Sequence, residues 1–220
     1  MILCDIGNTT YHFKVNDSCF KKGLNEDLDH IVLRDFDEVY FISVNEKGTE
    51  KFLQRFPHAI NLQKWVSFDT MYSSTLGIDR IFGSLLFDNA IIVDFGSAVT
   101  IDVMENKKHL GGYILPGYDA LSKIYPMISS KLAFEFDTNI DLDRLPHNTN
   151  EAISYAIIKM VRETILDIKK RYDLQLIITG ETAKIFLPFL ESYEYYEDLL
   201  FKGMEKIIKQ NRVKHKEEIE

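Results

Sequence analysis

Apolar and polar positions in the first part of the chain follow a pattern that is typical of short β-strands. Residues 1–6 are mainly apolar, residues 11–15 alternate between apolar and polar side chains, and residues 19–21 form a third short segment. Asn8-Thr9 and Asn16-Asp17 separate these segments and are residues that turns prefer. The pattern therefore predicts a three-stranded meander.

The rest of the chain alternates between apolar runs typical of buried strands and segments whose apolar residues recur with a helical period. Further strands are predicted over residues 38–44, 59–62, 90–93, 99–104, 110–115 and 174–178. Helices are predicted over residues 47–56, 78–87, 117–124, 148–171, 182–190 and 195–209. The charged residues after Gln210 are expected to fray.

The longest predicted helix has a clear beginning and an unusual first half. Asn148 and Glu151 have the spacing of a capping box, in which the two side chains satisfy backbone N–H groups of the first turn. Residues 152–161 are apolar around most of the helix circumference. Such a helix lies either in the core or in a subunit interface.

A short pattern occurs twice in the chain. Residues 3–10 resemble residues 92–99, because each segment has an apolar strand, then Asp-x-Gly with small hydroxyl or amide residues, then a second strand. Asp5 and Asp94 hold the same place in the two copies. Two equivalent hairpins predict two similar lobes, residues 1–88 and 89–220, that are packed together and face each other across a cleft.

Composition and charge narrow the classes of function. The 220 residues are 45% apolar and 27% charged, as in ordinary globular proteins. A net charge of -8 disfavours nucleic-acid binding, which requires a basic surface. The two cysteines form no disulfide framework or metal motif. We find no signal peptide and no apolar run near the roughly 20 residues that cross a bilayer, so we expect no membrane association and a cytoplasmic location.

The first Asp-x-Gly segment has the chemistry of a phosphate-binding loop. Gly7 allows close approach of the backbone to a phosphate, Asn8, Thr9 and Thr10 add donors, and Asp5 is suited to hold Mg²⁺. A plain hairpin turn is the better explanation of one such copy alone, but the second copy favours phosphate binding. The chain contains no Walker A motif.

Gly77-Ile78-Asp79-Arg80 places an acid and a base at the start of a predicted helix. Asp79 could orient or deprotonate a hydroxyl group, and the planar fork of Arg80 could bind a carboxylate or a phosphate. Helix capping is an equally good explanation of Asp79 by itself.

The second Asp-x-Gly segment continues as Ser97-Ala98-Val99-Thr100-Ile101-Asp102. Asp94 ends an apolar strand, where a buried carboxylate requires a cation or several N–H donors. Taken alone, Asp94 reads more simply as a residue that closes a turn, and Asp102 as a side chain on the opposite face of the strand. Gly111-Gly112 and Pro116-Gly117 flank the next strand and suggest close approach of a ligand or of another backbone. Taken alone, a tight turn without a ligand explains these glycines at least as well.

In order and spacing, these four motifs and Asn148-Thr149 resemble the pattern of the type III pantothenate kinase family over about residues 1–190. The resemblance implies an α/β fold of the actin-like, sugar-kinase ATPase class, which is a duplicated ribonuclease-H-like fold with mixed sheets flanked by helices. It implies a homodimer that phosphorylates pantothenate with ATP in the first step of coenzyme A synthesis.

The resemblance also assigns roles to residues. It implies that Asp79 is the proton acceptor and that Asp94 binds a monovalent cation, K⁺ or NH₄⁺. The residues implied in ATP binding are Asp5, Ile6, Gly7, Asn8, Thr9, Thr10, Tyr11, His12 and Ser97. The residues implied in pantothenate binding are Tyr72, Gly77, Ile78, Asp79, Arg80 and Thr149, the last across the dimer interface.

The sequence departs from the family pattern at three places. Ser97 replaces the usual Thr, Tyr72 is closer to Gly77 than expected, and Thr179-Gly180-Glu181 replaces Thr-Gly-Gly near the nucleotide base. Two other functions compete with the pantothenate kinase reading. One is a kinase of the same superfamily that acts on another hydroxyl, such as that of a sugar. The other is a non-catalytic regulatory protein, because some relatives have been described as transcriptional accessory factors.

Overall fold

The structure, a computed structural model, describes residues 1–31 and 37–217. The chain forms two compact units, of which the first comprises Met1–Leu86 with Leu199–Glu220 and the second comprises Phe87–Asp198. The predicted lobe boundary at residue 88 divides the chain once, whereas the contacts join the last helix to the first unit.

The first unit is a five-stranded mixed sheet with helices. Its strands are β1 (Ile2–Ile6), β2 (Thr10–Val15), β3 (Ser18–Gly23), β4 (Val39–Ser43) and β5 (Ile60–Asn61). Its helices are α1 (Glu46–Arg55), the 3-10 helix η1 (Leu62–Trp65), α2 (Ile78–Ser84) and α6 (Leu199–Glu217). The strand order is β3-β2-β1-β4-β5, with β1 antiparallel to β2 and parallel to β4. The predicted meander is therefore confirmed as β1 to β3.

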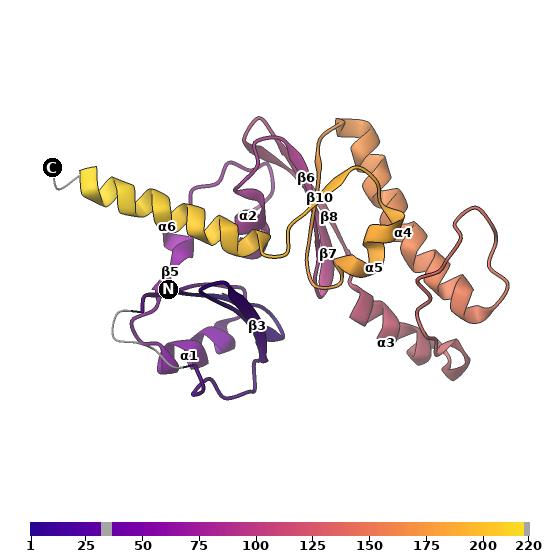
Figure 1. The fold of residues 1–220 in the computed structure, drawn as a ribbon, viewed down its shortest axis with the longest axis horizontal. Helices are drawn as coiled ribbons and strands as arrows, with labels where there is room; N and C mark the ends of the chain where they lie inside the picture. Colours follow the sequence, from indigo (N-terminus) through magenta and orange to yellow (C-terminus); the bar gives the residue numbers. More distant parts are fainter. Residues whose placement is uncertain (32–36, 218–220) are drawn as a thin grey trace. The chain divides into compact units, whose positions relative to one another are not determined.

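Alternating side chains of β1 face different helices in the first unit. Ile2, Cys4 and Ile6 pack in a cluster with Phe52 of α1. Leu3 packs in a second cluster with side chains of α2 and α6. Asp5 follows the same alternation as Leu3, so it projects from the face that α2 and α6 cover. Figure 1 shows α1 and α6 on opposite sides of this sheet.

The second unit is also a five-stranded mixed sheet with helices. Its strands are β6 (Ala90–Phe95), β7 (Ala98–Glu105), β8 (Lys108–Pro116), β9 (Leu176–Thr179) and β10 (Tyr193–Tyr195). Its helices are α3 (Tyr118–Ile128), η2 (Ser130–Leu132), α4 (Thr149–Tyr172), α5 (Ala183–Phe186) and η3 (Leu187–Phe189). The strand order is β10-β9-β6-β7-β8, with β6 antiparallel to β7 and parallel to β9.

The two sheets have the same topology. In each unit the first three strands form an antiparallel meander, and the fourth and fifth strands add in parallel on the other side of the first. The internal sequence repeat therefore reflects a duplicated fold, and the predicted ribonuclease-H-like class is confirmed.

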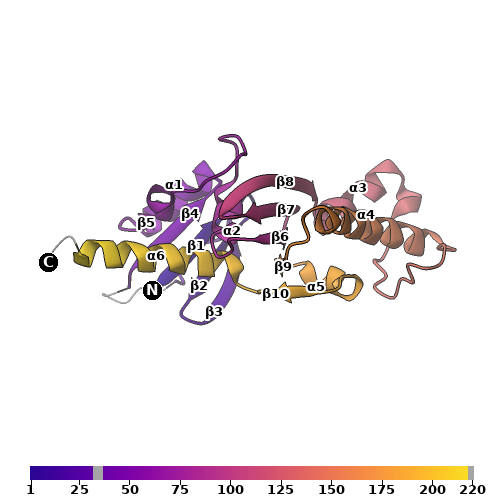
Figure 2. The same cartoon turned by 90° about the horizontal axis from the view of Figure 1, so that it is seen from above.

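The long helix α4 belongs to the core of the second unit. Ile153, Ile157, Val161 and Ile165 are buried in one hydrophobic cluster with side chains of β6, β7, β9 and α5, and Figure 2 shows the helix extending from the sheet beside α3. Asn148 caps the helix by accepting a hydrogen bond from the backbone N–H of Glu151 at 3.0 Å, as predicted. The Glu151 carboxylate accepts a hydrogen bond from the N–H of His147, one residue before the position that a capping box uses.

The C-terminal part of the chain differs from the sequence prediction. Tyr195, the predicted first residue of the last helix, belongs instead to β10 (Tyr193–Tyr195), which pairs with β9 at the edge of the sheet. The last helix begins at Leu199 and continues to Glu217, so it extends beyond the predicted end at residue 209, and fraying of the charged residues after Gln210 stays a prediction. Among the described residues, no helix is long and apolar enough to cross a membrane.

Candidate active site

The turn between β1 and β2 presents polar groups at its tip. The N–H of Gly7 donates to the carbonyl oxygen of Thr10 at 3.0 Å, and this bond closes the turn. Asn8 and Thr9 are exposed. A Cβ atom at Gly7 would lie 3.4 Å from the Thr10 oxygen and meet no other atom within 4 Å. The loop therefore leaves space for a ligand beside its backbone.

Not every residue predicted to bind ATP points its side chain outward. Ile6 and Tyr11 are fully buried, and the hydroxyl group of Tyr11 donates to the carbonyl oxygen of Gly48 at 2.9 Å. These two side chains stabilise the core, so only their backbone groups remain for ATP. The ring of His12 packs edge-on against the ring of Phe201 in α6, with the centroids 4.7 Å apart.

Asp5 lies directly opposite His12 in the β1–β2 ladder and is partly buried. Cross-strand neighbours have Cβ atoms about 5 Å apart, so the two side chains share one face of the sheet. Burial, and then the negative charge of Asp5, raises the pKa of the neighbouring Cys4 thiol well above its usual value. Cys4 is therefore an inert core residue beside a charged one.

The start of α2 brings Asp79 against the backbone. Asp79 Oδ1 accepts a hydrogen bond from the N–H of Arg80 at 2.9 Å. A Cβ atom at Gly77 would overlap Asp79 Oδ1, so glycine is needed for this side-chain position. Ile78 is buried, whereas Asp79 is partly exposed. The short helix thus presents the carboxylate while Ile78 anchors it in the core.

Arg80 and Tyr72 are brought together. The Arg80 guanidinium carbon lies 5.0 Å from the centroid of the Tyr72 ring, which is a cation–π distance. Arg80 is only 8% exposed. The backbone N–H of Tyr72 donates to Thr70 Oγ1 at 2.9 Å. Two residues predicted to bind pantothenate therefore form one local arrangement, despite the short spacing between Tyr72 and Gly77.

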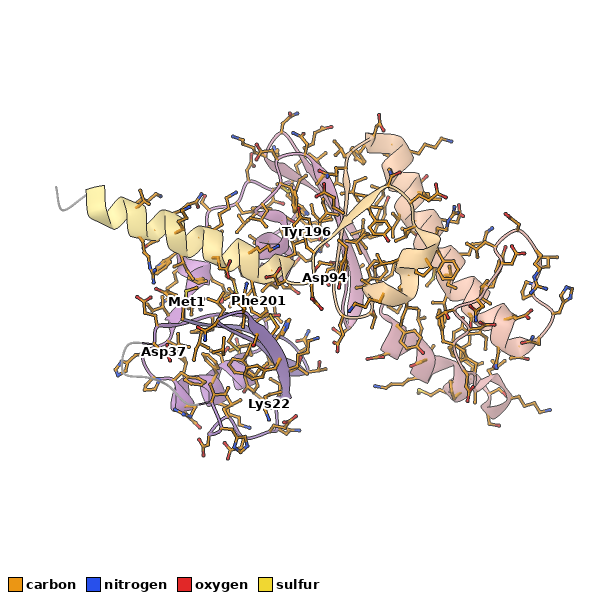
Figure 3. The ribbon with its side chains drawn as sticks, in the orientation of Figure 1. Met1, Lys22, Asp37, Asp94, Tyr196 and Phe201 are labelled. Carbon is orange, nitrogen blue, oxygen red and sulfur yellow. The ribbon has the colours of Figure 1, made fainter. Side chains whose placement is uncertain are left out.

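The loop after β6 is packed more tightly than the loop after β1. Asp94 (labelled in Figure 3) lies opposite Thr179, and Gly180 follows with a φ of +100°. A Cβ atom at Gly180 would overlap Asp94 Oδ1. A Cβ atom at Gly117 would lie 2.5 Å from the carbonyl oxygens of both Gly96 and Ser97. Two glycines from distant segments therefore shape the surroundings of Asp94 and Ser97.

The sequence prediction did not place Gly117 beside Gly96 and Ser97, or Gly180 beside Asp94. The available signals were the Pro116-Gly117 break and Gly180 directly after an apolar strand. The hydroxyl and backbone N–H of Thr182 both contact the carbonyl oxygen of Phe95 at 3.0 Å, so the Thr179–Thr182 segment is fixed to the loop of Asp94.

The residues present fit the cations that the resemblance implies. Among the described residues, no three acidic, His or Cys side chains gather into a metal site. Mg²⁺ is usually held by one or two carboxylates with phosphate oxygens and water, which is compatible with Asp5 alone. Asp94 and the carbonyl groups of the following loop are oxygen donors, the type that hard cations prefer.

Thr149 is the first residue of α4 and is exposed. Asn148 fixes its backbone through the helix cap, which leaves the Thr149 side chain accessible. This is compatible with its predicted role, which stays a prediction.

Two equivalent Asp-containing hairpins on a duplicated ribonuclease-H-like fold place the chain in the actin-like, sugar-kinase ATPase fold class. The profile of the family "Type III pantothenate kinase" matches residues 41–171. The chain belongs to the type III pantothenate kinase family.

Individual relatives agree with this assignment over nearly the whole chain. A type III pantothenate kinase of Campylobacter jejuni subsp. jejuni is 37% identical over 211 residues, covering 96% of this chain and 98% of the relative. One from Helicobacter hepaticus is 38% identical over 212 residues, covering 94% and 98%. A solved Campylobacter jejuni structure, described as a Baf family transcriptional activator, has a TM-score of 0.80, 36% identity and coverage of 96% and 99%.

Proposed function

We propose that this chain transfers a phosphoryl group from ATP to the terminal hydroxyl group of pantothenate, in the first step of coenzyme A biosynthesis. Membership of the type III pantothenate kinase family is the observation that carries this proposal. The arrangement of Asp79, Arg80 and Tyr72 supports it, because it combines a carboxylate that can orient a hydroxyl with a cation that can bind a carboxylate.

The Asp5–His12 loop and Ser97 would bind the ATP phosphates. Phosphoryl transfer passes through a loose transition state, so catalysis depends mainly on positioning and charge neutralisation. The exposed Asn8 and Thr9 offer donors, and the open space beside Gly7 admits a phosphate. When bound, Mg²⁺ beside Asp5 and K⁺ or NH₄⁺ beside Asp94 would supply positive charge that offsets the triphosphate.

Asp79 and Arg80 would act on pantothenate. Asp79 would orient the attacking hydroxyl group and accept its proton. The Arg80 guanidinium would bind the pantothenate carboxylate through two parallel hydrogen bonds. Packing on the Tyr72 ring holds the guanidinium plane before the substrate arrives, which reduces the entropy lost on binding.

A homodimer is supported by exposed apolar side chains on the second unit. Met127 of α3 is 82% exposed, Ile128 68% and Leu145 77%. Large exposed apolar side chains are candidates for burial in a subunit interface. Thr149 would reach the pantothenate of the partner subunit in such a dimer. The cytoplasmic location stays a prediction.

The two competing functions have weaker support. The name of the solved Campylobacter jejuni relative belongs to that protein, and the net charge of -8 opposes direct DNA binding by this chain. A neutral sugar has no carboxylate for a guanidinium to bind, so a carboxylate-binding role of Arg80 favours pantothenate over such a sugar.

ADP release tests the proposal directly. The purified protein is given ATP and Mg²⁺, with pantothenate, with a panel of sugars or without an acceptor, in Na⁺, K⁺ or NH₄⁺ buffers. We expect ADP release that depends on pantothenate and increases with K⁺ or NH₄⁺. Turnover with a sugar alone would favour the other kinase, and a folded protein inactive under every condition would favour the regulatory function.

A further inference from the structure

The last helix of the chain makes an unusually close contact with the helix that carries Asp79. Gly203 of α6 is buried against the backbone of Phe82 in α2. A Cβ atom at Gly203 would overlap the Phe82 carbonyl oxygen and would lie 2.9 Å from the carbonyl carbon. Backbone atoms cannot be moved by a change of rotamer, so only glycine permits this approach. Figure 1 shows α6 alongside α2.

A second contact lies one turn further along both helices. Lys206 Nζ donates a hydrogen bond to the carbonyl oxygen of Leu85 at 2.6 Å. Leu85 is the C-terminal cap of α2, where carbonyl groups have no partner within the helix and a positive charge is favourable. Helix α6 therefore holds α2 at two successive points, Phe82 and Leu85.

The same helix is fixed to the strand that follows the first phosphate loop. Phe201, labelled in Figure 3, packs against His12, and Glu205 forms a 2.8 Å ion pair with Lys14. Both partners belong to β2. Helix α6 thus has one set of contacts with β2 and another with α2, all within the first unit.

We propose that Gly203 is a positioning residue for Asp79 and Arg80, a role that rests on the proposed function. Phe82 follows Asp79 by three residues, so the two lie on neighbouring turns of one helix face. A shift of the Phe82 backbone therefore moves the whole short helix, including Asp79. Displacements of about 1 Å in a catalytic group can cost on the order of 100-fold in rate.

A matched pair of glycine substitutions tests this role. Gly203→Ala adds a methyl group at the helix contact, and we expect kcat with pantothenate to fall about 10-fold to 100-fold. Gly83→Ala adds the same group to α2 itself, where no heavy atom lies within 4 Å of the new Cβ. Alanine is preferred to glycine in a helix, so this control should retain activity and fold at least as stably as the wild type.

Binding and a second variant separate positioning from general damage. Activity is measured at a temperature where circular dichroism shows Gly203→Ala to be folded, and ADP affinity is measured by calorimetry. We expect near-normal ADP affinity with reduced kcat. Lys206→Met, which keeps the apolar stem and removes the bond to Leu85, should reduce kcat in the same direction by less. The exposed Lys209 gives the control Lys209→Met, with normal activity.

The outcomes are distinguishable. Wild-type protein that is inactive with pantothenate would overturn the proposed function. Active wild type together with normal kcat in folded Gly203→Ala and in Lys206→Met would overturn the positioning role alone. A parallel loss of ADP affinity and of kcat in both variants would also overturn it, because that result indicates unspecific disruption.

Discussion

The two units share a strand order but shape their Asp-containing loops in different ways. In the first unit, Ser43 ends β4 opposite Ile6, and its hydroxyl group accepts hydrogen bonds from the Asn45 N–H and the Thr49 hydroxyl at 2.9 and 2.7 Å. In the second unit, Gly180 holds the equivalent position after β9 and packs directly on Asp94. At this position the first unit therefore has a hydrogen-bonded side chain, Ser43, whereas the second unit has a glycine, Gly180, without a side chain.

This difference matches a division of tasks between duplicated halves. The loop of the first unit has open space at Gly7 and exposed polar side chains, which suits a phosphate chain. In the loop of the second unit, Gly180 packs on the Asp94 carboxylate and Gly117 packs on the carbonyl groups of Gly96 and Ser97. These oxygen atoms are donors of the type that would suit the monovalent cation proposed above. The first unit also holds α2, the helix that we propose binds the substrate, and its buried side chains pack with those of the sheet and of α6.

The largest expected effect comes from removing the charge of Asp79 in the first unit. Asp79→Asn should reduce kcat by about 10²-fold to 10⁴-fold, because the amide cannot accept the hydroxyl proton. Its remaining carbonyl oxygen can still accept the hydrogen bond from the Arg80 N–H, so folding should be unchanged. Steady-state kinetics and thermal melting measure both quantities. The exposed Asp17 provides the control Asp17→Asn, which should behave as wild type.

Near-wild-type turnover of Asp79→Asn would remove Asp79 from the mechanism and leave α2 with a binding role only. The proton acceptor would then have to be a residue other than Asp79.

The next effect concerns affinity for pantothenate. Arg80→Ala should raise KM for pantothenate about 10-fold to 100-fold, because a hydrogen bond to a charged group contributes about 1.5–3 kcal/mol. KM for ATP should change little. Arg55 gives a matched control, since its guanidinium lies 5.1 Å from the centroid of the Phe56 ring outside the site. If Arg55→Ala and Arg80→Ala had equal effects on pantothenate KM, the carboxylate-binding role would be wrong.

Local pattern was sufficient to predict much of the fold and the loops. The meander, the buried strands and the repeat of Asp5 and Asp94 depend on alternation and turn residues, which are local properties. The match of β1–β2 to β6–β7 follows from that repeat.

Features that depend on long-range packing could not be predicted from the sequence pattern. Asp102 is buried and hydrogen-bonded to His109 at 2.7 Å, because a register shift between Val103 and Met104 brings His109 opposite Met104. No local rule fixes that shift. The amphipathic last helix similarly shows an apolar side in sequence but not which unit covers it, and Gly203 was the one local sign of a close helix contact.

A single methyl group at Gly180 tests the close packing of this glycine on Asp94. Gly180→Ala should destabilise the protein by about 1–3 kcal/mol, because alanine is strained at positive φ and its Cβ would overlap Asp94. Gly96→Ala is the matched control, since its nearest neighbour would lie 3.7 Å from the new Cβ. Urea denaturation compares the two. Equal stabilities of Gly180→Ala and Gly96→Ala would show that the loop adapts to a side chain at position 180. The difference between Ser43 and Gly180 would then not affect the stability of the loop.

The smallest expected effects come from the helix caps that each unit places after a loop. Asn45 caps α1 through the Gly48 N–H at 2.7 Å, and Asn148 caps α4 through the Glu151 N–H at 3.0 Å. Each change to alanine should cost about 0.5–2 kcal/mol of unfolding free energy. Asn45 is partly buried and Asn148 is exposed, so water can replace the lost bond more easily at Asn148. Urea denaturation should therefore show a larger loss for Asn45→Ala, and the reverse order would mean that the polar network around Ser43 compensates for its missing cap.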